Sequence, residues 1–292
     1  MSISTELTAL NNYIKSAYTA VDTKGGTVPQ NKNMNNLSTA ISSIPAGGGV
    51  GLPREVSAQG VYSMPTTSFT FSLPAGTTDI AEYCMYYAFR DCRGLTSVDM
   101  SSLTSLNNTY SLYWAFASCA NLTSVNLSGL TTINGVSAMQ SAFISCTGLT
   151  SIDLSSVTTI NGNNALSGAF TSCQHLASIN FNSLSLINGS GAFSSAFQNT
   201  AITSMSFPSL SLIPANRALG TAFSNCGNLR SVSFPALTTN SFGDVANQFN
   251  RMLTYCSNVT VHFPASIQST IGSWSDVTSG FGGTNTTVLF DL

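Results

Sequence analysis

The chain has 292 residues, of which 43% are hydrophobic and only 7% are charged, and its formal net charge is −2. This composition excludes an intrinsically disordered chain, and it excludes broad electrostatic binding to nucleic acid or to an anionic membrane. No run approaches the roughly 18 continuous apolar residues of a membrane span, so we expect no membrane insertion. The first ten residues lack the pattern of a signal peptide, so we expect synthesis in the cytoplasm without general secretion.

Residues 1–45 are predicted to form a helical segment of two short amphipathic helices. Apolar residues recur in both halves at spacings of three and four, as one face of a helix requires. These residues are Leu7, Leu10, Ile14 and Val21 in the first helix and Met34, Leu37, Ile41 and Ile44 in the second. Such short helices are not stable alone, so they must pack on the solenoid predicted below, on copies of themselves or on another protein. The glycine-rich linker at 46–51 favours attachment or oligomerisation, with a trimer preferred.

The middle of the chain, residues 88–265, is predicted to be a repeat solenoid of about seven coils of roughly 27 residues. One phenylalanine marks each of the first six copies, and successive marks are 27, 27, 27, 27 and 26 residues apart. The marker residues are Phe89, Phe116, Phe143, Phe170, Phe197 and Phe223. No copy can bury its apolar face alone, so neighbouring copies must stack.

Each copy is predicted to contain a short strand, tight turns and a short helix. In the third copy, alternation around Ile152 predicts a strand over 150–154, and the apolar spacing over 137–145 predicts the helix. An Asn-Gly pair follows the last isoleucine of several copies, as at 134–135 and 161–162, and we expect a turn with positive φ there.

The two ends of the solenoid are predicted to be caps, because an end coil would otherwise expose its apolar face. Residues 52–87 form the first cap, with a strand over 69–74. Residues 266–292 form the second cap, with a closing strand over 286–292.

Two repeated polar positions have structural interpretations. The recurring cysteine of each copy is replaced by Thr200 in one of them, which indicates a small buried filler. The seven cysteines are odd in number and form no CxxC pair, so we expect neither a disulfide framework nor a zinc site. The asparagines of one turn, at 107, 134, 161 and 188, are predicted to form a ladder of amide hydrogen bonds.

The pattern CxxLTSVxL preceded by Ala-Phe resembles the BspA-like leucine-rich repeat, and residues 88–265 carry this resemblance. Members of that family are mostly bacterial surface and adhesion proteins, and similar repeats occur in phage structural proteins. The first 45 residues, with the KGGTVP turn and the NMNNLSTAISSI helix before a glycine-rich stretch, look like the N-terminal region of phage tail and other virion structural proteins.

No motif of an enzyme is present. The two histidines, His175 and His262, have no motif partner, and no HExxH, GxSxG or P-loop sequence occurs. Asp99 and Asp153 share one repeat position two coils apart, about 10 Å, which is too far for the carboxylate pair of a retaining glycosidase and at the loose edge for an inverting one. We therefore expect no enzyme activity, no catalytic residue, no cofactor and no metal site.

One feature breaks the repeat symmetry and suggests a binding surface. The two positions before Ala-Phe are aromatic in the first two copies and small or polar in later ones, and Tyr83 and Tyr110 lie nearby. The candidate binding residues are Tyr86, Tyr87, Tyr110, Tyr113 and Trp114. Aromatic faces beside hydroxyls suit a sugar or a protein partner. The alternative is that these rings only cover the N-terminal end of the solenoid.

The resulting hypothesis is a non-enzymatic virion protein of a bacteriophage, namely a component of a tail fibre, baseplate or head fibre. Residues 1–44 would bind other virion proteins or copies of themselves, and the repeats would contact a glycan or protein of the host surface. The alternative is a BspA-like adhesin on the bacterial cell surface. The absence of a signal peptide pattern favours the virion at this stage.

Overall fold

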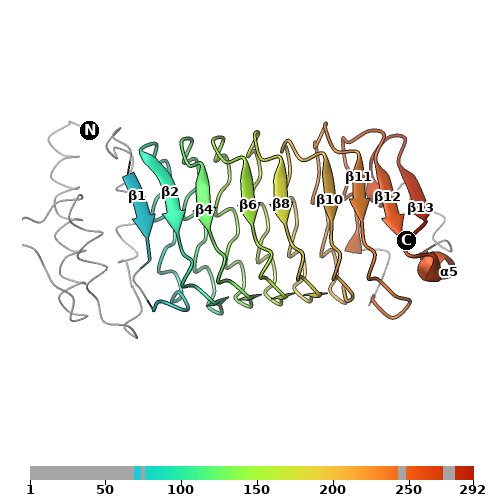
Figure 1. The fold of residues 1–292 in the computed structure, drawn as a ribbon, viewed down its shortest axis with the longest axis horizontal. Helices are drawn as coiled ribbons and strands as arrows, with labels where there is room; N and C mark the ends of the chain where they lie inside the picture. Colours follow the sequence, from blue (N-terminus) through green and yellow to red (C-terminus); the bar gives the residue numbers. More distant parts are fainter. Residues whose placement is uncertain (1–68, 74–75, 243–247, 272–279) are drawn as a thin grey trace, which may run out of the picture.

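The structure is a computed structural model, and it describes residues 69–73, 76–242, 248–271 and 280–292. These residues form a β-solenoid with few helices, in which strands of successive coils lie side by side along the long axis (Figure 1).

Several sequence predictions lie outside the described residues. They are the N-terminal helical segment with its eight apolar residues, the linker at 46–51 and the first part of the cap predicted at 52–87. The division of the chain into these segments therefore stays a prediction.

One side of the solenoid is a row of parallel strands, one from each coil (Figure 1). Within a strand the middle residue points inward and its neighbours point outward, as in Ser151–Asp153, where Ile152 is buried. The row consists of three sheets of three, two and four strands, and neighbouring strands within a sheet pair in parallel, for example Ile152 with Ile179. The strands are β1 (Phe69–Ser72), β2 (Leu95–Asp99), β4 (Ser124–Asn126), β6 (Ser151–Asp153), β8 (Ser178–Asn180), β10 (Ser204–Ser206), β11 (Ser231–Ser233), β12 (Thr260–Phe263) and β13 (Thr287–Phe290).

The expected strands over 69–74, 150–154 and 286–292 are confirmed as β1, β6 and β13, each slightly shorter than predicted. A second side carries a parallel four-stranded sheet of two-residue strands. These are β3 (Ser105–Leu106), β5 (Thr132–Ile133), β7 (Thr159–Ile160) and β9 (Leu186–Ile187). A short 3-10 helix η1 (Ala265–Ile267) and the helix α5 (Gln268–Ile271) lie near the C-terminus.

The short helix predicted over 137–145 is wrong, because this third side of each coil is a run of stacked turns. The amide of Met139 donates to the carbonyl oxygen of Ala165 in the next coil at 2.8 Å, whereas the amide of Ala142 donates back to Met139 at 3.1 Å. The backbone reverses at every fourth residue, with φ of 52° at Ser137 and 54° at Ser141. Apolar residues four apart suit both a helix and a turn that repeats every four residues, so the sequence pattern could not distinguish them.

Phenylalanine rings form a continuous column through the core. The six marker rings stack between coils, with neighbouring centroids 5.2–6.0 Å apart. Phe143 is fully buried and lies between Phe116 at 5.3 Å and Phe170 at 5.7 Å, nearly parallel to both. One ring per coil therefore sets the register of the stack by direct contact with the rings before and after it.

The prediction of positive φ at the Asn-Gly turns is also wrong. Gly162 does not have positive φ, but a Cβ built on it would lie 2.6 Å from the carbonyl carbon of Gly135 and would overlap the carbonyl oxygen. A Cβ built on Gly189 would likewise lie 2.5 Å from the carbonyl carbon of Gly162 and would overlap its carbonyl oxygen. Glycine is required here because the backbones of successive coils approach too closely for any side chain.

The ladder of asparagine amides expected from the sequence is present in part of the described coils. The amide of Asn134 donates to Asn107 at 2.7 Å, and that of Asn161 donates to Asn134 at 2.8 Å. Within the described coils the ladder joins Asn107, Asn134 and Asn161 and does not continue to Asn188, so it is shorter than predicted. Its first member bonds to Asp79 at 3.0 Å.

The repeated cysteines are buried thiols that hydrogen-bond to the preceding coil. Cys119, Cys146 and Cys173 each donate to the carbonyl oxygen of a marker phenylalanine at 3.0 Å. Thr200 fills the same place and donates to Phe197 at 2.9 Å. None of the seven cysteines forms a disulfide, and all are buried. The interpretation as a small buried filler is confirmed.

We expect these thiols to be unreactive in the folded protein at pH 8. Burial raises the pKa of Cys173 to about 12 and that of Cys256 to about 11, so neither is a thiolate there. A thiol-specific reagent should modify few cysteines under native conditions and close to seven after denaturation without reductant. Fewer than seven in the denatured protein would reveal disulfides and contradict the filler role.

The same shifts predict how stability depends on pH. The folded pKa values of Cys173 and Cys256 lie above the roughly 8.5 of an unfolded cysteine, so at these two positions the unfolded chain loses protons first as the pH rises. Cys119 differs, because hydrogen bonds with Cys146 and Cys92 lower its pKa to about 5. The contribution of Cys173 and Cys256 to the free energy of unfolding should therefore be constant below about pH 8 and should fall between that value and about pH 12. Urea titrations across this range measure it.

Candidate binding surface

Six aromatic side chains of the first two coils form one cluster, which we call the aromatic patch. It comprises Tyr83, Tyr86, Tyr87, Tyr110, Tyr113 and Trp114, and all six are half-buried. The five candidate residues from the sequence are thus brought together, and Tyr83 joins them. The patch lies on the stacked-turn side, where the amide of Tyr87 donates to the carbonyl oxygen of Tyr113 at 3.0 Å.

The rings of the patch pair between the two coils. Tyr86 stacks on Tyr113 with centroids 4.9 Å apart and ring planes 8° from parallel. Tyr83 stacks on Tyr110 at 5.2 Å, and Tyr87 stacks on Trp114 at 5.7 Å. Edge contacts within each coil join the three pairs, such as Tyr110 with Tyr113 at 5.1 Å. The patch is therefore a fixed platform, because each ring is held by at least two others.

Four of these rings occupy backbone positions that favour small residues. Tyr83, Tyr87, Tyr110 and Trp114 have φ between 53° and 58°, in the left-handed region. This conformation costs an ordinary residue roughly 1–2 kcal/mol. Bulky residues are uncommon there. Later coils mostly place serine, asparagine or glycine at the same positions, such as Ser141 and Gly168 in register with Trp114, whereas the sixth coil has Arg217 and Thr221 there.

A cation lies against the patch. The guanidinium carbon of Arg90 is 5.4 Å from the ring centre of Tyr87 and 5.2 Å from that of Trp114, within the range of a cation–π contact. Its Nε atom also lies 3.3 Å from Asp91 Oδ2. Sequence analysis missed Arg90. Its position three residues after Tyr87, within one turn of the backbone, could have indicated that it lies close to that ring.

The hydroxyl of Tyr87 is neutral at physiological pH. Burial of Tyr87 and the nearby Tyr86 and Tyr113 raise the pKa of Tyr87 to about 12, and Arg90 only partly opposes this. The patch consequently offers apolar ring faces edged by hydroxyl groups that can donate as well as accept hydrogen bonds.

The carboxylates that share a repeat position have structural partners. Asp99 accepts a hydrogen bond from the amide of Ser101 at 3.0 Å, and Asp153 accepts one from Ser155 at 2.9 Å. Asn126 does the same with Ser128 at 3.2 Å. These side chains close the turn that follows each strand, so the pair has the structural role of an Asx turn.

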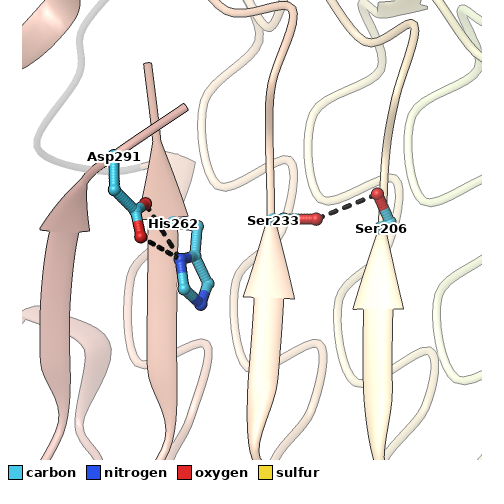
Figure 2. Close-up of polar contacts among 4 residues, drawn as sticks. All are labelled: Ser206, Ser233, His262 and Asp291. Atoms are coloured by element: carbon cyan, nitrogen blue, oxygen red, sulfur yellow. Dashed lines mark hydrogen bonds and ion pairs between the residues drawn. The ribbon is translucent and has the colours of Figure 1, made fainter. Parts of the chain in front are cut away.

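A second polar group lies near the C-terminal end of the strand row (Figure 2). Nδ1 of His262 lies 2.9 and 3.0 Å from the carboxylate oxygens of Asp291, one coil further on. Ser233, in register with His262, donates its hydroxyl to Ser206 at 2.9 Å and not to the histidine. The group therefore lacks the nucleophile–base hydrogen bond of a catalytic triad. Instead, the contact of His262 with Asp291 joins strand β12 to the residue that follows strand β13. Sequence analysis missed this pair because its members are 29 residues apart.

Within the described ranges, no helix has the length and hydropathy to cross a membrane. In the same ranges, no three side chains of the His, Cys, Asp and Glu types come together as a metal ion would need.

Comparison with known proteins identifies relatives of the repeats. The profile of the BspA type leucine-rich repeat region matches in six copies, over residues 61–194 and 140–275. Matching crystal structures include a leucine-rich repeat protein of T. pallidum, which is 19% identical, with coverage of 75% of this chain and 87% of that one and a TM-score of 0.42. Another is a leucine-rich repeat protein of Bacteroides ovatus, 18% identical, covering 75% and 66% of the two chains with a TM-score of 0.28. No curated protein matches significantly.

Proposed function

Because the chain belongs to the BspA type leucine-rich repeat family, we propose that it is a non-enzymatic binding protein whose aromatic patch contacts a glycan or protein on a cell surface. In this proposal the solenoid is a rigid scaffold and the patch on its first two coils is the adhesive surface.

The observation that carries this proposal is the backbone conformation of the patch. Tyr87 and Trp114 keep large rings at positive φ, although Ser141 and Gly168 fill the same positions in the next two coils. Folding alone favours the small residues there, since the left-handed conformation is costly for bulky side chains. Locally unfavourable conformations are typical of functional sites, where the side chain is needed for a purpose other than stability.

We further propose that the protein is part of a bacteriophage virion, as a component of a tail fibre, baseplate or head fibre. The support is the resemblance of the first 45 residues to the N-terminal region of virion structural proteins, together with the adhesive repeats that follow. Those residues would attach the solenoid to other virion proteins or to further copies, with a trimer preferred. The second candidate is a BspA-like adhesin on the bacterial cell surface, which the family membership favours.

Adhesion is expected to depend on the rings of the second coil. Replacing Tyr113 and Trp114 by serine, as at Ser194 and Ser195 of the fifth coil, removes two ring faces and is compatible with the local backbone. Binding of the labelled protein to susceptible cells should fall at least tenfold, which corresponds to about 1.4 kcal/mol. The matched control is Tyr255→Ser, which removes an exposed ring at positive φ near the other end of the solenoid.

Unchanged adhesion of the Tyr113→Ser/Trp114→Ser protein, with its melting temperature retained, would contradict the proposal. A collapse of the melting temperature would instead support the alternative that the rings only cover the end of the solenoid.

Removal of residues 1–50 tests the attachment role. A chain that begins at Gly51 keeps every repeat, so it should remain soluble, rich in β-structure and cooperative in unfolding. Light scattering should show a smaller oligomer than for the full chain, and incorporation into particles should be lost. Normal assembly of the shortened chain would place the anchor elsewhere, and unfolding of the shortened chain would assign the helices to the solenoid core.

A further inference from the structure

The aromatic ladder stops after the second coil. Tyr86 and Tyr113 are stacked almost parallel, one coil apart, so the other face of Tyr113 is directed toward the third coil. In the phenylalanine column the next ring would follow at about the same separation, as Phe143 follows Phe116 at 5.3 Å. In the patch the next residues in register are Gln140 and Ser141, and neither is aromatic. The row of rings therefore ends at the third coil in a step from aromatic to polar side chains.

We propose that this step is a subsite for a neutral oligosaccharide, in which one sugar ring stacks on Tyr113 and Trp114 where the ladder would have placed its next ring. The inference rests on the proposed function, since it names the ligand class of the same patch. The C–H face of a sugar ring is apolar and flat enough to cover an aromatic face, while its hydroxyls remain at the edge for hydrogen bonds.

Groups that could bind those hydroxyls follow along the same side of the solenoid. The amide of Trp114 donates to the carbonyl oxygen of Gln140 at 3.0 Å, and the amide of Ser141 donates to that of Ser167 at 2.9 Å. These two main-chain bonds place Gln140 and Ser167 on consecutive coils beyond the rings. Both side chains are half-buried and uncharged, and they can donate and accept hydrogen bonds. A chain of sugars would run from the rings along this row, parallel to the long axis.

The charged groups around the patch disfavour two other ligand classes that suit aromatic rings, namely quaternary ammonium compounds and anionic sugars. A quaternary ammonium on the patch would meet the positive charge of Arg90, whose guanidinium carbon lies 5.2 Å from the ring centre of Trp114. A carboxylated or sulfated sugar would need uncompensated positive charge. Arg90 is 3.3 Å from Asp91, and the first coil also exposes Glu82. From the third coil to Asn216 the row beyond the rings contains no cation.

The test uses the full chain with Trp274→Phe, so that Trp114 becomes its single tryptophan. Its fluorescence is titrated with neutral hexamers of glucose, galactose, mannose and N-acetylglucosamine. Hexagalacturonate serves as the anionic probe and choline as the cationic one. We expect at least one neutral hexamer to bind, with the affinity reduced about tenfold or more by Trp114→Ser and recovered largely by Trp114→Phe, which restores a ring. Tyr255→Ser should leave the affinity unchanged. Because the Trp114 variants have lost the fluorescent side chain, saturation-transfer NMR measures the affinity of all the variants.

The outcomes separate this inference from the proposed function. If the Tyr113→Ser/Trp114→Ser protein loses cell adhesion while no neutral hexamer binds, or while hexagalacturonate or choline binds more tightly, the patch is adhesive but its ligand is not a neutral glycan. If a hexamer binds at Trp114 while cell adhesion is indifferent to the two substitutions, the subsite stands and the proposed function is wrong.

Discussion

Replacing Phe143 by alanine is expected to lower the free energy of unfolding by about 3–5 kcal/mol. The side chain is fully buried and its ring stacks on Phe116 and on Phe170, so its removal leaves a cavity and interrupts the column in both directions. Neighbouring coils cannot close the gap, because their backbones are held in register by hydrogen bonds such as that from the Phe143 amide to Ala169 at 2.9 Å. Urea unfolding followed by circular dichroism measures the loss.

The matched control for this substitution is Val136→Ala, which shortens an exposed apolar side chain in the same coil. It should change the free energy of unfolding by less than about 0.5 kcal/mol. A loss at Phe143 no larger than that of the control would mean that the column does not hold the coils together.

The second large effect is expected for Gly162→Ala, about 3 kcal/mol of destabilisation, which is the upper end for overpacking. The added methyl group would overlap the backbone carbonyl of Gly135 and would lie 3.0 Å from that of Asn134, and neither can move without breaking the register of the coils. Thermal and urea unfolding of the single variant measure the effect.

Gly227→Ala is the control, because a Cβ at that glycine meets nothing within 4 Å and its φ is not positive. It should be neutral or stabilising by up to about 1 kcal/mol, through the lower entropy of the unfolded chain. Equal effects at the two glycines would show that close approach of the coils is not the reason for the Asn-Gly pair.

The parts of the fold that the sequence predicts are those that depend on identical residues in register. The spacing of the marker phenylalanines places Phe143 between Phe116 and Phe170, and alternation around Ile152 places a strand there. Both follow from stacking, which needs only a constant period. Stacking also explains the thiol and amide ladders, since a polar group repeated once per coil finds the same partner in the neighbouring coil each time. That partner is a phenylalanine carbonyl oxygen for the thiols and another asparagine for the amides.

The parts that the sequence does not predict depend on hydrogen bonds between coils. Ala138, Met139, Ala142 and Phe143 have the spacing of a helix, but in a solenoid the amide of Met139 finds its acceptor in Ala165 of the next coil. For the same reason the positive φ falls on Ser137 and Ser141 and not on the Asn-Gly pair.

The candidate site was predictable as a set of residues but not as a surface. The break in repeat symmetry identified Tyr113 and Trp114, and the structure adds what a sequence cannot contain, namely their parallel stacking on the first coil and the positive φ at Trp114. The contact of Arg90 with the rings, and the end of the row of rings at Gln140, could be recognised only from the positions of the rings in the structure.

The central claim is that the aromatic patch makes the contact with the bound surface, and oxidative footprinting tests it most directly. Hydroxyl radicals modify exposed tyrosine and tryptophan side chains, and mass spectrometry gives the rate for each one. The protein is oxidised alone and when adsorbed to the cell envelope. We predict slower oxidation of Tyr113 and Trp114 in the adsorbed state and an unchanged rate for Tyr255, which is 78% exposed near the opposite end. Protection of Tyr255 with no protection of the patch would contradict the account.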